Sequence, residues 1–218
     1  MHAFQNAGGH VLLSARPYPI ESDTAIMAGS VVKLSGGLVV QAAAAETGPI
    51  LGIAAETHTG VEDMLDLRSN GEEILVYDNP ELIFESGAPE LNAASGTATT
   101  IVFSDVAAGV AAAAMVTGVV QLKSRVDGSG NKDVPGECRK ISAYADKTAT
   151  VSDGGTAAAG DVYYVYPAIG SIVGAMDAEA SRLVLTASGQ TKLRVVGHDP
   201  IRHKLRLMAV EHSLGVEN

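Results

Sequence analysis

The sequence predicts a mainly β protein, a barrel or sandwich of short antiparallel strands. Short runs rich in Val, Ile and Leu recur at intervals of roughly 8–12 residues, the spacing typical of such folds. Turn residues separate the runs, and the 218 residues include 24 glycines. Capped helix patterns are scarce, and the best short candidate covers residues 59–67. Hydrophobic residues make up 46% of the chain and charged residues 18%, which excludes a disordered polar chain.

The first half contains six predicted strands, each bounded by turn residues. Gly36-Gly37 separates the first two runs at hairpin spacing. Gly52 lies inside the third run, where a glycine often marks a bulge or a close backbone approach. Asn70-Gly71 and Asp78-Asn79-Pro80 delimit the fourth. The six runs are 31–34, 38–41, 50–54, 73–77, 82–85 and 97–103.

The second half continues in the same way. Residues 139–145 alternate between apolar and polar side chains, as expected of a strand with one buried face. Residues 161–166 combine two valines with three tyrosines, the strongest strand signal in the chain. The predicted strands here are 115–126, 139–145, 161–166, 183–186, 193–196 and 205–210.

We expect three regions along the chain. Residues 1–22 form an extended N-terminal arm, because the prolines of Arg16-Pro17-Tyr18-Pro19 restrict the backbone to extended geometry. Residues 23–105 form a β-barrel domain. Residues 106–218 form a second β-rich region, and either one elaborated barrel or two β domains would fit. The Ala- and Gly-rich residues 107–114 are the natural junction.

Composition excludes several kinds of partner. The net charge of −10 and the pI near 4.9 repel phosphate backbones, so we expect no nucleic acid. The single cysteine, Cys138, allows no internal disulfide. The first residues lack the pattern of a signal peptide. Residues 101–122 carry only Asp105 as a charge and are long enough for a bilayer, but the Ala/Gly centre favours a buried strand–linker–strand passage. We therefore expect no membrane partner.

No nucleotide-binding or hydrolase motif is present, so cofactor binding and catalysis have little support. Residues 127–133 place oxygen side chains at alternate positions as a calcium loop does. Lys132 and Cys138 stand where that loop needs Gly and an acid, however, so a solvated hairpin loop is favoured. We expect no metal and no cofactor. Glu62 and Asp63 with Asp66 could form paired carboxylates, but we interpret them as the solvated face of a helix.

Histidines and the cysteine offer the remaining chemistry. His198-Asp199, with His203 and His212, is the densest histidine group, and a His–carboxylate pair suits a base or a metal ligand. Its basic neighbours favour a surface strand instead, and a positive strip in an acidic chain suits docking on an acidic partner. Arg139 and Lys140 next to Cys138 are expected to lower the pKa of its thiol. No catalytic residue is assigned.

Two apolar segments resemble the small capsid decoration, or cement, proteins of tailed bacteriophages. Residues Ala28-Gly29-Ser30-Val31-Val32-Lys33-Leu34 and Ile50-Leu51-Gly52-Ile53-Ala54-Ala55-Glu56 are similar to strands that recur in the compact β-barrel, or β-tulip, of that family. Residues 77–85 resemble a segment of larger phage head proteins. The resemblance covers about residues 24–103, and an internal echo at 156–176 extends it.

The resemblance implies a non-enzymatic virion protein, assembled in the host cytoplasm, that binds the capsid exterior. Its partners would be the major capsid protein and further copies of itself, as a trimer or dimer. We expect the arm to contact the shell, and removal of residues 1–19 to weaken binding without disturbing the fold. Alternatives are a tail, collar or fibre-base module, a hydrolase that uses His198 and Asp199, and a carbohydrate-binding protein. The expected capsid-contact residues are Phe4, Arg16, Pro17 and Tyr18.

Overall fold

The computed structural model consists almost entirely of antiparallel strands, which confirms the predicted mainly β class. The single short helix among the described residues is α1 (Ala112–Met115). The structure describes residues 2–6, 14–21, 23–60, 73–107, 110, 112–126, 137–152, 154–172, 175–177, 180, 183–185 and 192–213. The candidate helix at 59–67 lies mostly outside these residues.

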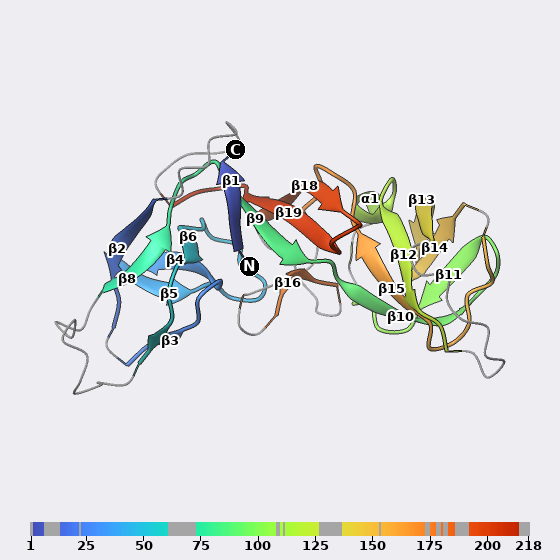
Figure 1. Cartoon of the computed structure of the whole chain (residues 1–218), viewed down its shortest axis with the longest axis horizontal. Coiled ribbons are helices and arrows are strands. Elements are labelled where there is room, and N and C mark those ends of the chain that lie inside the picture. Colours follow the sequence, from blue (N-terminus) through green and yellow to red (C-terminus); the bar gives the residue numbers. More distant parts are fainter. Residues whose placement is uncertain are drawn as a thin grey trace.

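Three larger sheets follow one another along the long axis of the molecule (Figure 1). The five-stranded sheet has the order β2 (Ala15–Pro19), β8 (Glu73–Tyr77), β6 (Gly52–Ala54), β4 (Val31–Ser35) and β5 (Leu38–Gln41). The four-stranded sheet in the middle has the order β1 (His2–Asn6), β9 (Leu82–Gly87), β19 (Lys204–Ala209) and β18 (Leu193–Asp199). Two-stranded ribbons join β3 (Ala25–Ile26) to β7 (His58–Thr59) and β16 (Ala175–Met176) to β17 (Leu183–Val184).

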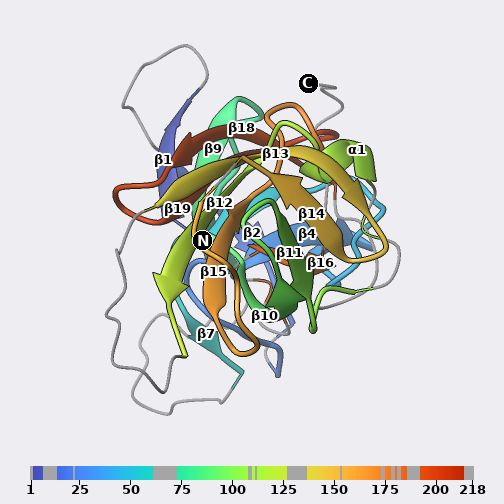
Figure 2. The ribbon, with the colours of Figure 1, turned by 90° about the vertical axis from the view of Figure 1, so that its right-hand side faces the viewer.

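The third sheet is a closed six-stranded barrel, seen from its outer end in Figure 2. Its inward residues alternate with outward ones along each strand and fill the interior with apolar side chains such as Leu91, Phe103 and Val165. The helix α1 packs against β13, with Ala114 and Met115 buried. The strand order is β10 (Glu90–Gly96), β11 (Thr100–Phe103), β14 (Thr148–Val151), β13 (Cys138–Ala145), β12 (Val119–Ser124) and β15 (Val162–Tyr166).

The boundary expected between residues 105 and 106 falls inside this barrel. Strands β10 and β11 precede it and the other four barrel strands follow it. Residues 101–122 run from β11 through α1 into β12, which confirms the strand–linker–strand interpretation of that segment. No helix among the described residues is long and apolar enough to cross a membrane.

The inner strands β4 and β6 of the five-stranded sheet carry buried residues on both faces, which explains their continuous apolar runs. Val31 and Ile53 belong to the large core shared with the middle sheet and the barrel, whereas their neighbours Val32 and Ala54 belong to a second core. Successive strand residues point to opposite faces, so a sheet between two cores needs apolar residues at every position. A parallel bridge from Ile20 to Val39 also joins the two outer strands of this sheet.

A hairpin tip connects the middle sheet to the barrel. The turn between β18 and β19 places His203 over β15, where its ring stacks on Tyr164 with centroids 4.2 Å apart. The Tyr166 hydroxyl lies 3.4 Å from His203 Nδ1 and donates a hydrogen bond of 2.8 Å to Gln121 Oε1. The backbone N–H of Ala88 donates to the His203 carbonyl at 2.9 Å. The tip is therefore held by both backbone and side-chain contacts.

A glycine is needed at position 52 because the backbone of the neighbouring strand β8 lies very close to it, as the sequence pattern predicted. A Cβ at this position would lie 1.9 Å from the carbonyl oxygen of Tyr77. We expect Gly52→Ala to lower the free energy of unfolding by about 2–3 kcal/mol, because the backbone must shift to relieve the overlap. Gly87→Ala in β9 is the matched control, since nothing lies within 4 Å of its Cβ position. Equal urea-unfolding midpoints for the two variants would contradict this close approach.

The turn between β13 and β14 contains two non-glycine residues in the left-handed region. Asp146 has φ 45° and Lys147 has φ 66°, the signs required by a two-residue type I′ hairpin turn. Lys147→Gly should raise the free energy of unfolding by about 0.5–1 kcal/mol, because glycine adopts this geometry without steric cost. The same replacement at exposed Lys140, inside β13, should lower it. Thermal unfolding of both variants tests these opposite changes in stability. A Lys147→Gly variant less stable than the wild type would contradict backbone strain at Lys147.

Candidate partner-binding surface

Strand β2 carries three of the four residues expected to contact a partner, and it pairs with β8 of the same chain. Pro17 lies opposite Leu75 and Pro19 opposite Glu73. Because proline has no N–H to donate, the two prolines weaken this strand as a template for a further strand. The surface that β2 offers is therefore made by side chains, and that of Pro17 is exposed.

The neighbouring residues Arg16 and Tyr18 both reach Asp78, which is only 3% exposed. The Tyr18 hydroxyl donates a hydrogen bond of 2.5 Å to Asp78 Oδ2, and Arg16 Nη1 lies 3.5 Å from the same oxygen. The Tyr18 ring also packs against the core of the five-stranded sheet. Asp78 directly follows β8, and the sequence pattern predicts only a turn at Asp78-Asn79-Pro80. Nothing in the sequence indicated the contacts of Asp78 with Arg16 and Tyr18.

These contacts give Arg16 and Tyr18 different roles. Burial raises the pKa of Tyr18 to about 12, and the hydrogen bond to Asp78 and the charge of Asp78 add to the effect. The phenol stays protonated and fastens β2 to the sheet. The Arg16 side chain is 67% exposed despite its ion pair. Arg16 and Pro17 are consequently the β2 residues that a partner would reach.

Phe4 does not lie near these residues in the fold. It belongs to β1, which pairs with β9 of the middle sheet, and it falls at the register shift between Ala3 and Gln5. Residues 2–6 and 15–19 are extended, as expected, but each segment is a strand of one of the chain's own sheets. Removal of residues 1–19 would strip β8 of one of its two neighbours and β9 of β1, so the deletion would remove strands from two of the chain's own sheets.

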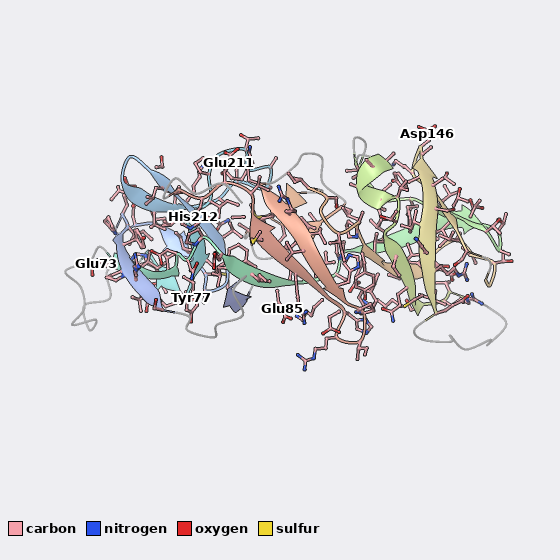
Figure 3. The ribbon with its side chains drawn as sticks, turned by 90° about the horizontal axis from the view of Figure 1, so that it is seen from above. Glu73, Tyr77, Glu85, Asp146, Glu211 and His212 are labelled. Carbon is pink, nitrogen blue, oxygen red and sulfur yellow. The ribbon has the colours of Figure 1, made fainter. Side chains whose placement is uncertain are left out.

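Of the three histidines, His198 and His203 both approach Tyr166, and His212 lies apart from them. His198 Nε2 lies 2.6 Å from the carbonyl oxygen of Pro167, and burial lowers the pKa of this ring. Asp199 instead approaches Arg202 and Arg206, each at 4.0 Å. His212 lies at the other end of the molecule, beside the five-stranded sheet (Figure 3), where it bridges to Ile50. His198 and Asp199 thus interact with separate groups, which gives the hydrolase alternative no support from this geometry.

Cys138 lies in β13 beside two cations, but the expected effect on its thiol is wrong. Arg139 turns into the barrel, is 2% exposed, and donates to both carboxylate oxygens of Glu137 at 3.1 Å. It also donates to the carbonyl of Gly155 at 2.7 Å. Burial raises the pKa of the Cys138 thiol. The pair of buried Arg139 with partly exposed Glu137 is a structural feature of the barrel that the sequence did not reveal.

The remaining candidate groups fall largely outside the described part of the chain. The possible calcium loop at 127–133 and the carboxylates Glu62, Asp63 and Asp66 all lie there. Among the described residues, no group of three or more His, Cys, Asp or Glu side chains is arranged to hold a metal ion.

Comparisons of the chain with protein-family models, with curated proteins and with solved structures found no match. The arrangement of strands and surface residues is therefore the basis for the functional proposal.

The hydrogen bond from Tyr18 to Asp78 gives a pH-dependent prediction. Tyr18→Phe should lower the free energy of unfolding by about 1–2 kcal/mol at neutral pH. The folded pKa of Tyr18 exceeds the unfolded value near 10, so this contribution is complete below pH 10 and is lost as the pH rises toward 12. The difference between wild type and Tyr18→Phe in urea unfolding should narrow over that interval.

Tyr77→Phe is the control, because it makes the same chemical change on the strand next to β2. It should alter stability by no more than about 0.5 kcal/mol. A pH-independent difference for Tyr18→Phe, or an equal effect at Tyr77, would contradict the role given to the Tyr18–Asp78 bond.

Proposed function

We propose that the chain is a non-enzymatic virion protein that binds the outer surface of an icosahedral phage capsid and braces neighbouring major capsid subunits. One observation carries the proposal. The two segments that resemble decoration proteins, 28–34 and 50–56, contain the adjacent antiparallel strands β4 and β6, with Gly52 at the close approach to β8. Strand β5 and a loop separate the two segments in the sequence, yet the segments are neighbours in one sheet, and this supports the proposal.

The form of the molecule supports a bracing role. Its sheets follow one another in an elongated body, and the large core continues from the barrel into the five-stranded sheet. Such a body reaches across more than one subunit while it resists bending. An acidic chain also suits the outer face of a shell better than its DNA-filled interior. Many copies multiply a modest contact, so each interface need not be large.

The partner-facing residues on β2 are Arg16 and Pro17 in this proposal. Phe4 remains a sequence-based prediction for the same role. Tyr18 contributes indirectly, because it fixes the strand that displays its neighbours. Self-association and the major capsid protein as partner are part of the proposal, with no cofactor required.

A density gradient of lysate from the source, followed by mass spectrometry of this chain, tests the proposal. Co-migration with DNA-filled heads in tens to hundreds of copies per particle is the expected result. A few copies per particle would contradict the decoration role and favour the tail, collar or fibre-base alternative. Migration with soluble protein alone would refute a virion role.

Variants of β2 test the contact surface. The double variant Arg16→Ala/Pro17→Ala should reduce binding to stripped heads by about tenfold, because exposed side chains are removed while the Tyr18–Asp78 bond remains. Lys140→Ala is the control, since Lys140 is exposed on the barrel wall and lies far from β2 in the fold. Head binding is measured by co-sedimentation, with circular dichroism to verify folding. If the folded double variant binds heads as well as the wild type does, the β2 surface does not contact the capsid.

A further inference from the structure

Charge is distributed very unevenly along the chain. Residues 15–81 hold three basic and eleven acidic residues, a net charge of −8 out of the total of −10. Residues 192–206 hold five basic residues and one acidic residue, a net charge of +4 before any histidine is counted. The described residues of the first range hold seven acidic and two basic residues and supply the five-stranded sheet and the β3–β7 ribbon. The second range supplies β18 and the start of β19. Among the described residues, the end with the five-stranded sheet is thus acidic and the middle hairpin is basic.

The turn of the basic hairpin is rigid and presents an apolar side chain to solvent. Ile201 is 91% exposed, the highest value among the large hydrophobic residues described. The adjacent Arg202 side chain is 70% exposed. Asp199 Oδ1 accepts a hydrogen bond of 3.1 Å from the backbone N–H of Arg202 and fixes the turn. A preformed loop loses little conformational entropy on binding.

The tip is also braced from below. His203 has φ 55° and is held between the Tyr164 ring and the Tyr166 hydroxyl. Two cations nearer the base of the hairpin have carboxylate partners within the chain, since Lys192 pairs with Glu211 and Arg206 lies 3.6 Å from Glu85. Arg202 is the one exposed basic residue in 192–206, because the other four are only partly exposed. Its charge is therefore the most accessible of these cations to a partner.

The acidic end offers a complementary surface, which we name the acidic corner: Glu21, Asp23 and Glu73. All three residues are exposed. Glu73 lies opposite Pro19 in the β2–β8 pair, and Glu21 and Asp23 follow β2 in the turn closed by the Thr24 N–H to Glu21 carbonyl bond of 3.0 Å. Three carboxylates thus gather at one end of a strand pair.

The tip and the acidic corner are far apart within one molecule. Figure 3 shows Glu73 at the end of the molecule remote from the barrel, whereas the turn of the β18–β19 hairpin lies beside barrel strand β15 through the stack of His203 on Tyr164. A contact between the two surfaces must therefore join different copies.

We propose that the tip of the β18–β19 hairpin, Ile201 and Arg202, docks on the acidic corner of a second copy of this chain. The contact is head-to-tail, because it uses two different surfaces of the same protein. Repetition of such a contact closes a ring or extends a chain of copies. It specifies the self-association that the proposed function includes and rests on that part alone, and because it requires no shell it can be tested without a capsid.

Sedimentation velocity of the full chain tests the contact at two ionic strengths. The wild type should associate in ~20 mM NaCl and dissociate in ~500 mM NaCl, because salt screens attraction between exposed charges. Arg202→Glu should weaken association by about tenfold or more, and Ile201→Ser should weaken it without changing the charge. Lys140→Glu makes the same charge reversal on the barrel wall and should associate like the wild type.

A mixing experiment distinguishes the head-to-tail contact from a symmetric one. Glu21→Lys/Glu73→Lys should be deficient in association by itself, like Arg202→Glu. Mixed together, they should associate again, because the intact tip of the first variant fits the intact corner of the second and the two reversed surfaces also carry opposite charges. Circular dichroism and unfolding midpoints control for folding of each variant.

Three results would overturn the proposal. These are a wild type that stays monomeric in low salt, association that Arg202→Glu leaves intact, and a mixture of the two variants that does not associate. Failure of shell binding in the gradient experiment would leave this contact unaffected, so the two proposals fail separately.

Discussion

One continuous stretch of chain, residues 73–96, sets the arrangement of the whole molecule. It forms β8 in the five-stranded sheet, β9 in the middle sheet and β10 in the barrel, with only short breaks between them. The breaks at 78–81 and 88–89 are short, and the Leu82 N–H to Asn79 carbonyl bond of 3.0 Å fixes the first, so the three sheets lie next to one another in chain order. The large apolar core spans the same distance, and its burial stabilises the row along its length.

The hairpin of β18 and β19 secures this arrangement beside that stretch. β19 pairs with β9, and the turn of the hairpin reaches β15 of the barrel through His203. The backbone N–H of Val165 donates to the carbonyl of Pro89 at 2.8 Å, which ties the break between β9 and β10 to the same barrel strand. The joint therefore has two supports, and bending there would break hydrogen bonds as well as the ring stack. Rigidity of this kind suits a protein that braces others.

Most strands were predictable because burial leaves a local pattern, whereas pairing depends on residues far apart. The runs at 31–34, 38–41 and 73–77 match β4, β5 and β8 closely. The glycine inside the apolar run 50–54 predicted the close approach of another strand at Gly52. The sequence left open whether residues 106–218 share a barrel with the first half, because nothing local distinguishes a strand that pairs with the next strand along the chain from one that, like β10, also pairs with β15. Buried polar partners were missed for the same reason. Asp78 looks like an ordinary turn residue until β2 lies beside it.

Electron cryo-microscopy of DNA-filled heads from the source lysate tests the decoration claim most directly. The account predicts repeated density on the outer surface of the shell, into which the elongated three-sheet body fits with β2 toward the capsid subunits. Heads with a bare outer surface, or density for this chain confined to the tail or collar, would contradict it.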